Sequence, residues 1–118
     1  MSRMVKCGLI QCSIATSNDQ PLDVIKKAMI DKHIPFIEDA GRKGVQILCL
    51  QEIFYGPYFC AEQKTKLYNS TEKIPDGPTV KLMQEFAKKY QMVMIVPIYE
   101  EEQAGVYYNT ATVIDADG

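Results

Sequence analysis

Three short apolar runs are separated by two stretches with helical periodicity, and this alternation restricts the possible folds more than any other feature of the sequence. The runs cover residues 6–12, 47–50 and 92–96. Apolar residues recur at helical spacing between residues 22 and 40, and again between residues 82 and 90. Strands that alternate with amphipathic helices predict an α/β fold, with a sheet that is at least partly parallel and with right-handed crossovers.

A fourth strand is predicted at residues 106–114, after the turn-like stretch Glu100–Gly105. This turn is short enough for the last two strands to form an antiparallel hairpin, so the predicted order is β-α-β-α-β-β. The three acids that open the turn are interpreted as a solvated loop. A further short helix is possible at residues 61–68.

The first predicted helix carries its own start and stop signals. Ser17–Pro21 offers capping side chains followed by a proline that the first turn tolerates. Gly41 or Gly44 should end the helix. Pro35 should kink or divide it near His33, because proline lacks a backbone donor.

The composition narrows the class of protein. With 118 residues, 47% hydrophobic and 24% charged, the chain should form one globular domain. The net charge is −2, and the 13 basic residues are well mixed with 15 acidic ones, so nothing indicates a nucleic-acid partner. The sequence has neither an apolar run of membrane-spanning length nor a signal peptide, which predicts a cytoplasmic protein.

The cysteines do not indicate a metal site. Cys7, Cys12, Cys49 and Cys60 form no CxxC pair, and the single histidine, His33, lies far from all of them. Cys7 and Cys49 fall in apolar runs and are predicted to be buried, whereas Cys12 and Cys60 should be more accessible. Glycine-rich phosphate loops are also absent. We therefore expect no metal, no cofactor and no disulfide.

Glu52 is the main candidate for chemistry. It directly follows the run Ile47–Leu50, which reads as a strand buried on both faces of a parallel sheet. Ligands collect at the carboxyl ends of parallel strands, and aromatic walls raise the pKa of a carboxylate. Such walls are available in Phe54, Tyr55, Tyr58 and Phe59, which Gly56-Pro57 bends into a loop. Two interpretations remain open, a general base and a solvated acid at the end of a strand.

Asn109 is the candidate for supporting that acid. It shares a strand face with Tyr107, Ala111 and Val113 by the period of two. If that face is covered, the amide must find hydrogen-bond partners. The amide could tie down nearby backbone, or it could orient a neighbouring acid such as Glu52.

Five stretches in order resemble the N-terminal part of the nitrilase superfamily of carbon–nitrogen hydrolases. They are Val5–Gln11, the glycine joint Ala40–Val45, Leu48–Glu52, Asp76–Pro78 and Tyr108–Gly118. The segment Gln51–Cys60 is most similar to the branch that contains β-ureidopropionase and N-carbamoylputrescine amidase. The resemblance covers essentially the whole chain and implies part of the α-β-β-α sandwich of that superfamily.

The resemblance also implies a chemistry with three residues, a glutamate, a lysine and a cysteine. Glu52 stands at the position of the general base, which would activate a cysteine thiol for attack on an amide or ureido carbonyl. The expected substrate is a small N-carbamoyl amine or N-carbamoyl-β-amino acid. Tyr55, Tyr58 and Phe59 are predicted to contact that substrate, and Asn109 to support the site.

The departures from the family pattern matter as much as the matches. No lysine here matches the catalytic one, and none of the four cysteines matches the nucleophile. Residues 1–118 are therefore predicted to be part of a domain whose C-terminal portion is absent, inactive alone, with exposed strands and apolar patches. The parent enzyme is expected to be a homo-oligomer. The alternative is a non-catalytic α/β module or a truncated pseudo-enzyme, which would bind a partner or small ligand through residues 54–59.

Overall fold

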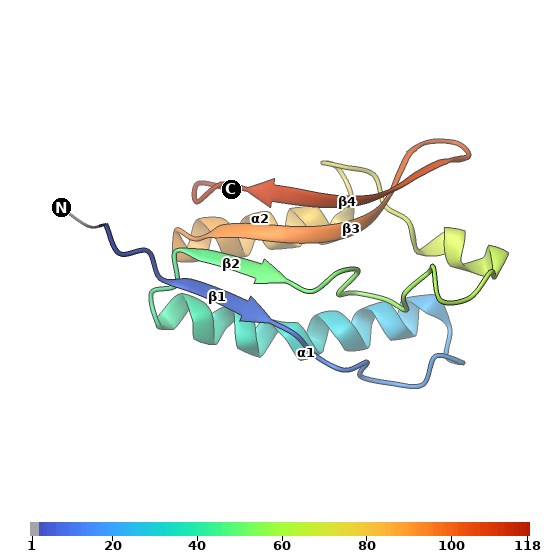
Figure 1. The fold of residues 1–118 in the computed structure, drawn as a ribbon, viewed down its shortest axis with the longest axis horizontal. Helices are drawn as coiled ribbons and strands as arrows, with labels where there is room; N and C mark the ends of the chain where they lie inside the picture. Colours follow the sequence, from blue (N-terminus) through green and yellow to red (C-terminus); the bar gives the residue numbers. More distant parts are fainter. Residues whose placement is uncertain (1–2) are drawn as a thin grey trace.

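The computed structural model describes residues 3–118, so residues 1 and 2 of the predicted domain lie outside the described part (Figure 1). The elements are β1 (Cys7–Ile10), α1 (Leu22–Arg42), β2 (Ile47–Leu50), the 3-10 helix η1 (Thr65–Ser70), α2 (Pro78–Tyr90), β3 (Val93–Gln103) and β4 (Val106–Ile114). The predicted β-α-β-α-β-β order is confirmed. The possible short helix at residues 61–68 is replaced by η1, which lies further along the chain.

The four strands form one mixed sheet in the order β1-β2-β3-β4. The pairs β1–β2 and β2–β3 are parallel, and β3–β4 is antiparallel, as predicted for the hairpin. The carboxyl ends of β1, β2 and β3 therefore point to one end of the molecule, where the segment after β2 and η1 also lie (Figure 1). No helix within residues 3–118 is long and apolar enough to cross a membrane.

Both α-helices pack side by side against the same face of the sheet (Figure 1). The inward-facing strand residues alternate with outward-facing ones, as the period of two requires. The core between helices and sheet includes Leu48, Leu50, Met94, Val96, Ile98, Ile37, Val80 and Met83. Burial of these side chains is the main source of stability, at about 1.5–3 kcal/mol for each large apolar side chain.

Over the opposite face of the sheet, which we call the open face, no helix lies within residues 3–118. One row of it runs across all four strands through Leu9, Cys49, Ile95 and Val113. Leu9 and Val113, at the ends of the row, are 84% and 67% exposed. The exposed apolar residues expected from the sequence are therefore present. The prediction that Ile47–Leu50 is buried on both faces is wrong for this chain, since only Leu48 and Leu50 are fully covered.

The open face also corrects the prediction for one cysteine. Cys7 is exposed, although it was predicted to be buried, because it belongs to the outermost strand and points to the open face. Cys49 is half-buried on the same face. The apolar character of a strand residue does not specify which face of the sheet receives a cover.

Helix α1 differs from the prediction in its N-terminal cap and at Pro35. In the described part of the chain no side chain caps it, since Pro21 occupies the cap position and the Ser17 hydroxyl accepts a hydrogen bond from the Asp19 N–H in the preceding turn. The helix also runs unbroken through Pro35, which is exposed. Proline leaves the carbonyl four residues earlier without its helical partner, and on the solvent side water can take that place.

Candidate functional site

The five residues after β2 are tied to the other three strands at the carboxyl end of the sheet. The side chain of Gln51 accepts a hydrogen bond from the backbone N–H of Cys12, just after β1. Glu52 follows, and its carboxylate accepts a hydrogen bond from the side-chain amide of Asn109 on β4. Of the two interpretations left open for Asn109, the structure shows the contact with the acid, between residues that are 57 positions apart.

Glu52 and Asn109 are both exposed, and they meet on the open face of the sheet. The Asn109 side-chain amide thus donates a hydrogen bond to Glu52, although the amide is exposed and could bond to water instead. A carboxylate in this position can accept a proton from a group placed above the sheet, while the amide holds its other side. A carboxylate that an amide holds on one side and that solvent can reach on the other has the geometry that a general base can use.

The backbone turns sharply immediately after Glu52. Ile53 has a φ of 47°, a left-handed conformation that is a genuine outlier for a β-branched residue. The turn sends Ile53 and Phe54 into the core, where they are 2% and 0% exposed. Phe54 packs edge-on against the buried ring of His33 on α1, with ring centroids 5.1 Å apart. Core packing thus stabilises a strained bend that leaves Glu52 outside.

Tyr55 is fully buried, and its hydroxyl forms hydrogen bonds with backbone groups of this chain. The oxygen accepts a hydrogen bond from the Tyr99 N–H at 3.0 Å. It lies 3.1 Å from the carbonyl oxygen of Ser70 and 3.3 Å from that of Tyr99, to which it can donate. Burial raises the pKa of Tyr55 to about 12. The substrate contact predicted for Tyr55 stays a prediction.

Tyr58 and Phe59 lie nearer the surface. Tyr58 is 49% exposed, and a hydrogen bond with Cys60, followed by the charge of Glu52, raises the pKa of its hydroxyl. Phe59 stacks on Tyr99 with ring centroids 3.8 Å apart. Tyr58 lies near the acid, as expected, and Glu52 remains exposed to solvent. The substrate contacts predicted for both residues are compatible with this exposure and stay predictions.

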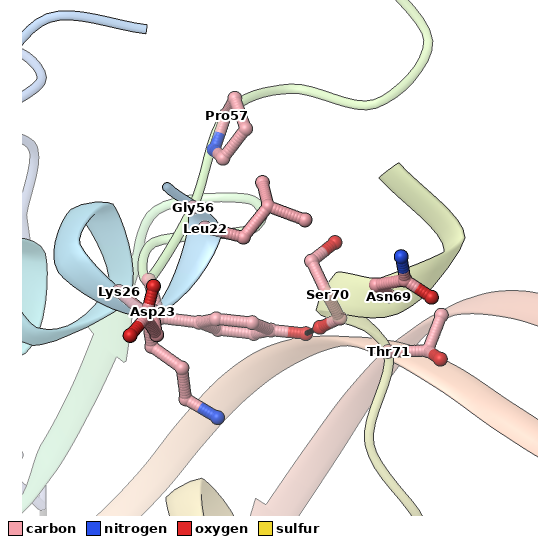
Figure 2. A pocket seen from close by; sticks show the side chains of 9 residues that line it. Leu22, Asp23, Lys26, Gly56, Pro57, Asn69, Ser70 and Thr71 are labelled. Atoms are coloured by element: carbon pink, nitrogen blue, oxygen red, sulfur yellow. Dashed lines mark hydrogen bonds between the residues drawn. The ribbon is translucent and has the colours of Figure 1, made fainter. Parts of the chain in front are cut away.

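The two larger cavities beside the aromatic segment have different linings. One, of about 540 Å³, is lined by Phe59, Cys60, Glu62, Gln63, Lys64, Thr65, Leu67, Tyr68 and Tyr99. The other, of about 210 Å³, lies between the start of α1, Gly56–Pro57 and Asn69–Thr71, and Tyr55 forms one wall (Figure 2). Glu52 lines neither cavity, so within this chain the acid faces open solvent above the sheet.

A buried acid that no sequence pattern indicated, Glu72, supports the same end of the sheet. Its carboxylate accepts hydrogen bonds from the Thr79 N–H at 2.9 Å and the Thr79 hydroxyl at 2.7 Å, and it pairs with Lys26. The backbone N–H of Glu72 donates to the Tyr99 carbonyl. No pattern around Glu72 distinguishes it from the other polar residues of its segment, because all its partners are remote in sequence or on a later helix.

Gln51 was also missed as a site residue, although its position offered a signal. It directly follows β2, as Glu52 does, so both side chains belong to the carboxyl end of the sheet. Within residues 3–118, no three His, Cys, Asp or Glu side chains are grouped closely enough to hold a metal ion.

Residues 6–118 match the model of the family described as carbon-nitrogen hydrolase. Over 118 residues the chain is 39% identical to a β-ureidopropionase from Arabidopsis thaliana, covering 98% of this chain and 29% of that protein. Over 82 residues it is 38% identical to an N-carbamoylputrescine amidase from Solanum lycopersicum, covering 70% of this chain and 27% of that protein. The chain therefore spans less than a third of the length of these relatives.

The fold is similar to the crystal structure of a carbon-nitrogen hydrolase from Helicobacter pylori G27. The TM-score is 0.80, with 24% sequence identity over 96% of this chain and 36% of that one. At this identity the likeness establishes the α/β fold.

Proposed function

Because the chain belongs to the carbon–nitrogen hydrolase family, we propose that it carries the general base of an enzyme that hydrolyses N-carbamoyl compounds. The resemblance to the nitrilase superfamily noted from the sequence is confirmed by the family match. The substrate we propose is an N-carbamoyl amine or an N-carbamoyl-β-amino acid, the classes suggested by the names of the two plant relatives. The observation that carries the proposal is the hydrogen bond from Asn109 to Glu52 at the carboxyl end of the sheet.

In the proposed reaction the Glu52 carboxylate takes the proton of a cysteine thiol. The resulting thiolate attacks the ureido carbonyl, and a lysine stabilises the negative charge that forms on the carbonyl oxygen. The intermediate collapses with loss of ammonia, which receives a proton from Glu52. Water, deprotonated by the same carboxylate, then attacks the resulting thiocarbamate, the thiolate leaves and takes the proton from Glu52, and the released carbamic acid decomposes to CO2 and the amine.

We propose that residues outside this sequence supply the lysine and the cysteine. Two observations support this. The chain covers only 29% and 27% of the two plant relatives, and none of its four cysteines matches the nucleophile position implied by the resemblance. The open face beside Glu52 leaves space for a thiol to approach the acid. The 118 residues alone are then expected to be inactive.

The remaining parts of the proposal concern binding and assembly. Tyr58 and Phe59 would contact the substrate, since Tyr58 lies near Glu52 and the ring of Phe59 lies beside that of Tyr58. From the family resemblance alone, we also propose that the protein carrying this domain is a homo-oligomer. Sedimentation of that protein at several concentrations tests this, and a single monomeric species would contradict it.

The central experiment measures ammonia released from N-carbamoyl-β-alanine and from N-carbamoylputrescine by the protein that carries this domain. Glu52→Gln keeps the shape of the side chain and removes the base. We expect it to lower kcat on the active substrate by about 10²–10⁴-fold, the usual contribution of a general base. Glu85→Gln, an exposed acid on α2, is the matched control and should retain activity.

Two outcomes would contradict the proposal. Turnover by the isolated 118 residues that survives Glu52→Gln would remove the assigned role of that acid. Absence of turnover with both substrates would favour the non-catalytic module, and binding of the same compounds, measured by calorimetry, would then show whether residues 54–59 form its site.

A further inference from the structure

Strand β3 continues past the point where its neighbour β2 ends. The pairing of β2 with β3 reaches only Cys49 and Ile95, whereas β3 extends to Gln103. Beyond Ile95, no strand within residues 3–118 pairs with the side of β3 that faced β2, and Glu72 forms an isolated parallel bridge with Glu100 there. The backbone groups on that side must find other partners, because Tyr99 is only 3% exposed there.

At Tyr99 those partners come from two loops. The Tyr99 N–H donates to the hydroxyl of Tyr55 at 3.0 Å. The Tyr99 carbonyl accepts from the N–H of Glu72 at 2.9 Å. The hydroxyl of Tyr55 therefore replaces the carbonyl that a continued β2 would offer, and its own proton is directed to the carbonyl of Ser70 or Tyr99.

The other side of the same position holds Asn109. Tyr99 and Asn109 are register partners in the antiparallel pair β3–β4. Since both backbone groups of Tyr99 point to the loops, this pair lacks direct backbone hydrogen bonds, and in such pairs the side chains are closest. Asn109 in turn donates its amide to Glu52.

Glu52 and Tyr55 are thus both attached to the register pair Tyr99–Asn109, which we call the rung, each through a different residue of the pair. Glu52 is attached through Asn109, and Tyr55 through the backbone of Tyr99. Only Ile53 and Phe54 lie between them, both are buried, and Ile53 is in a left-handed conformation that such a residue avoids when free. Releasing either attachment would let the strained turn relax and move the carboxylate.

We propose that Tyr55 is a positioning residue, whose hydroxyl holds the turn after β2 so that the Glu52 carboxylate stays on Asn109. That the placement of the Glu52 carboxylate matters for catalysis rests on the proposed function. The placement itself rests on the hydrogen bonds described above. In this role Tyr55 is buried and bonds to the backbone of Tyr99, and it does not touch the reacting atoms.

The test follows the side-chain amide protons of Asn109 by NMR in the 118-residue chain during a pH titration. In the native chain the amide shift should follow the protonation of Glu52, and Glu52→Gln should abolish that response. Tyr55→Phe removes one oxygen atom and should reduce the response by at least half. The matched control is Ile25→Val, which trims the fully buried Ile25 of α1 and should leave the response unchanged.

Each outcome either supports or contradicts the proposed role of the Tyr55 hydroxyl. A native response in Tyr55→Phe overturns the proposal, and so does an equal loss in Ile25→Val, which would indicate general loosening of the fold. If Tyr55→Phe does not fold, 3,5-difluorotyrosine at position 55 keeps the ring and the hydroxyl. The Asn109 signal should then change as that more acidic hydroxyl ionises, and a constant signal would refute the proposal. None of these readouts needs turnover, so their failure is separate from a failure of the hydrolase assignment.

Discussion

The contact between α1 and α2 leads to a prediction about Gly41→Ala. This substitution should destabilise the native chain but stabilise a chain that lacks the Tyr90 ring. Gly41, near the end of α1, lies directly against the ring of Tyr90 at the end of α2. A Cβ atom added at Gly41 would lie 2.3 Å from Cγ of that ring. Carbon atoms pack at about 3.5–4.0 Å, so Gly41→Ala would require the ring to move by more than 1 Å.

Two effects of known size compete in Gly41→Ala. Overpacking costs about 1–3 kcal/mol, since Cγ is next to the backbone of Tyr90 and cannot swing away like the tip of a flexible chain. Alanine gains up to about 1 kcal/mol over glycine in a helix. We expect the clash to prevail, with a loss of about 1 kcal/mol in the free energy of unfolding.

The same substitution should stabilise the chain once the ring is gone. In a Tyr90→Ala background only the helix preference remains, so adding Gly41→Ala should raise the free energy of unfolding by up to about 1 kcal/mol. The coupling between the two sites is then about 2 kcal/mol, within the range seen for residues in contact.

The assay is urea unfolding of the four chains of this cycle, followed by circular dichroism with a common m-value. Additive effects of Gly41→Ala and Tyr90→Ala, with a coupling below about 0.5 kcal/mol, would refute the contact between Gly41 and the Tyr90 ring.

Two further predictions concern buried polar groups. Burial is the main cause that lowers the pKa of His33 below its usual value, so the unfolded chain takes the proton more readily. The free energy of unfolding should therefore fall as pH drops below about 6.5, and His33→Gln should remove that slope in urea titrations; an equal slope in the variant would contradict this. Glu72→Gln should lower the free energy of unfolding by about 1–3 kcal/mol, because the buried carboxylate serves Thr79 and Lys26. The exposed Glu85→Gln is its control, and equal effects on the urea midpoint would refute the role of Glu72.

The element order and the place of Glu52 could be predicted from the sequence because both depend on local patterns. Apolar periodicity distinguishes strands from helices within about ten residues, and the carboxyl end of a parallel strand is a general position for ligands. The pairing of Glu52 with Asn109 was one of two interpretations that the sequence left open, because the strand period fixes only the face that carries the amide. The capping of α1 by Ser17–Pro21 and the division at Pro35 were local inferences that the helix environment overrode.

Only the tertiary structure decided which face of the sheet is covered, and hence that Cys7 and Leu9 are exposed. It also decided that Tyr55 turns inward to the backbone of Tyr99, 44 residues away, and that Glu72 is buried. Burial and hydrogen-bond partners depend on groups brought together from distant parts of the chain. A sequence pattern describes the preference of a residue for a strand or a helix, but the partner that a polar atom finds is a property of the assembled fold.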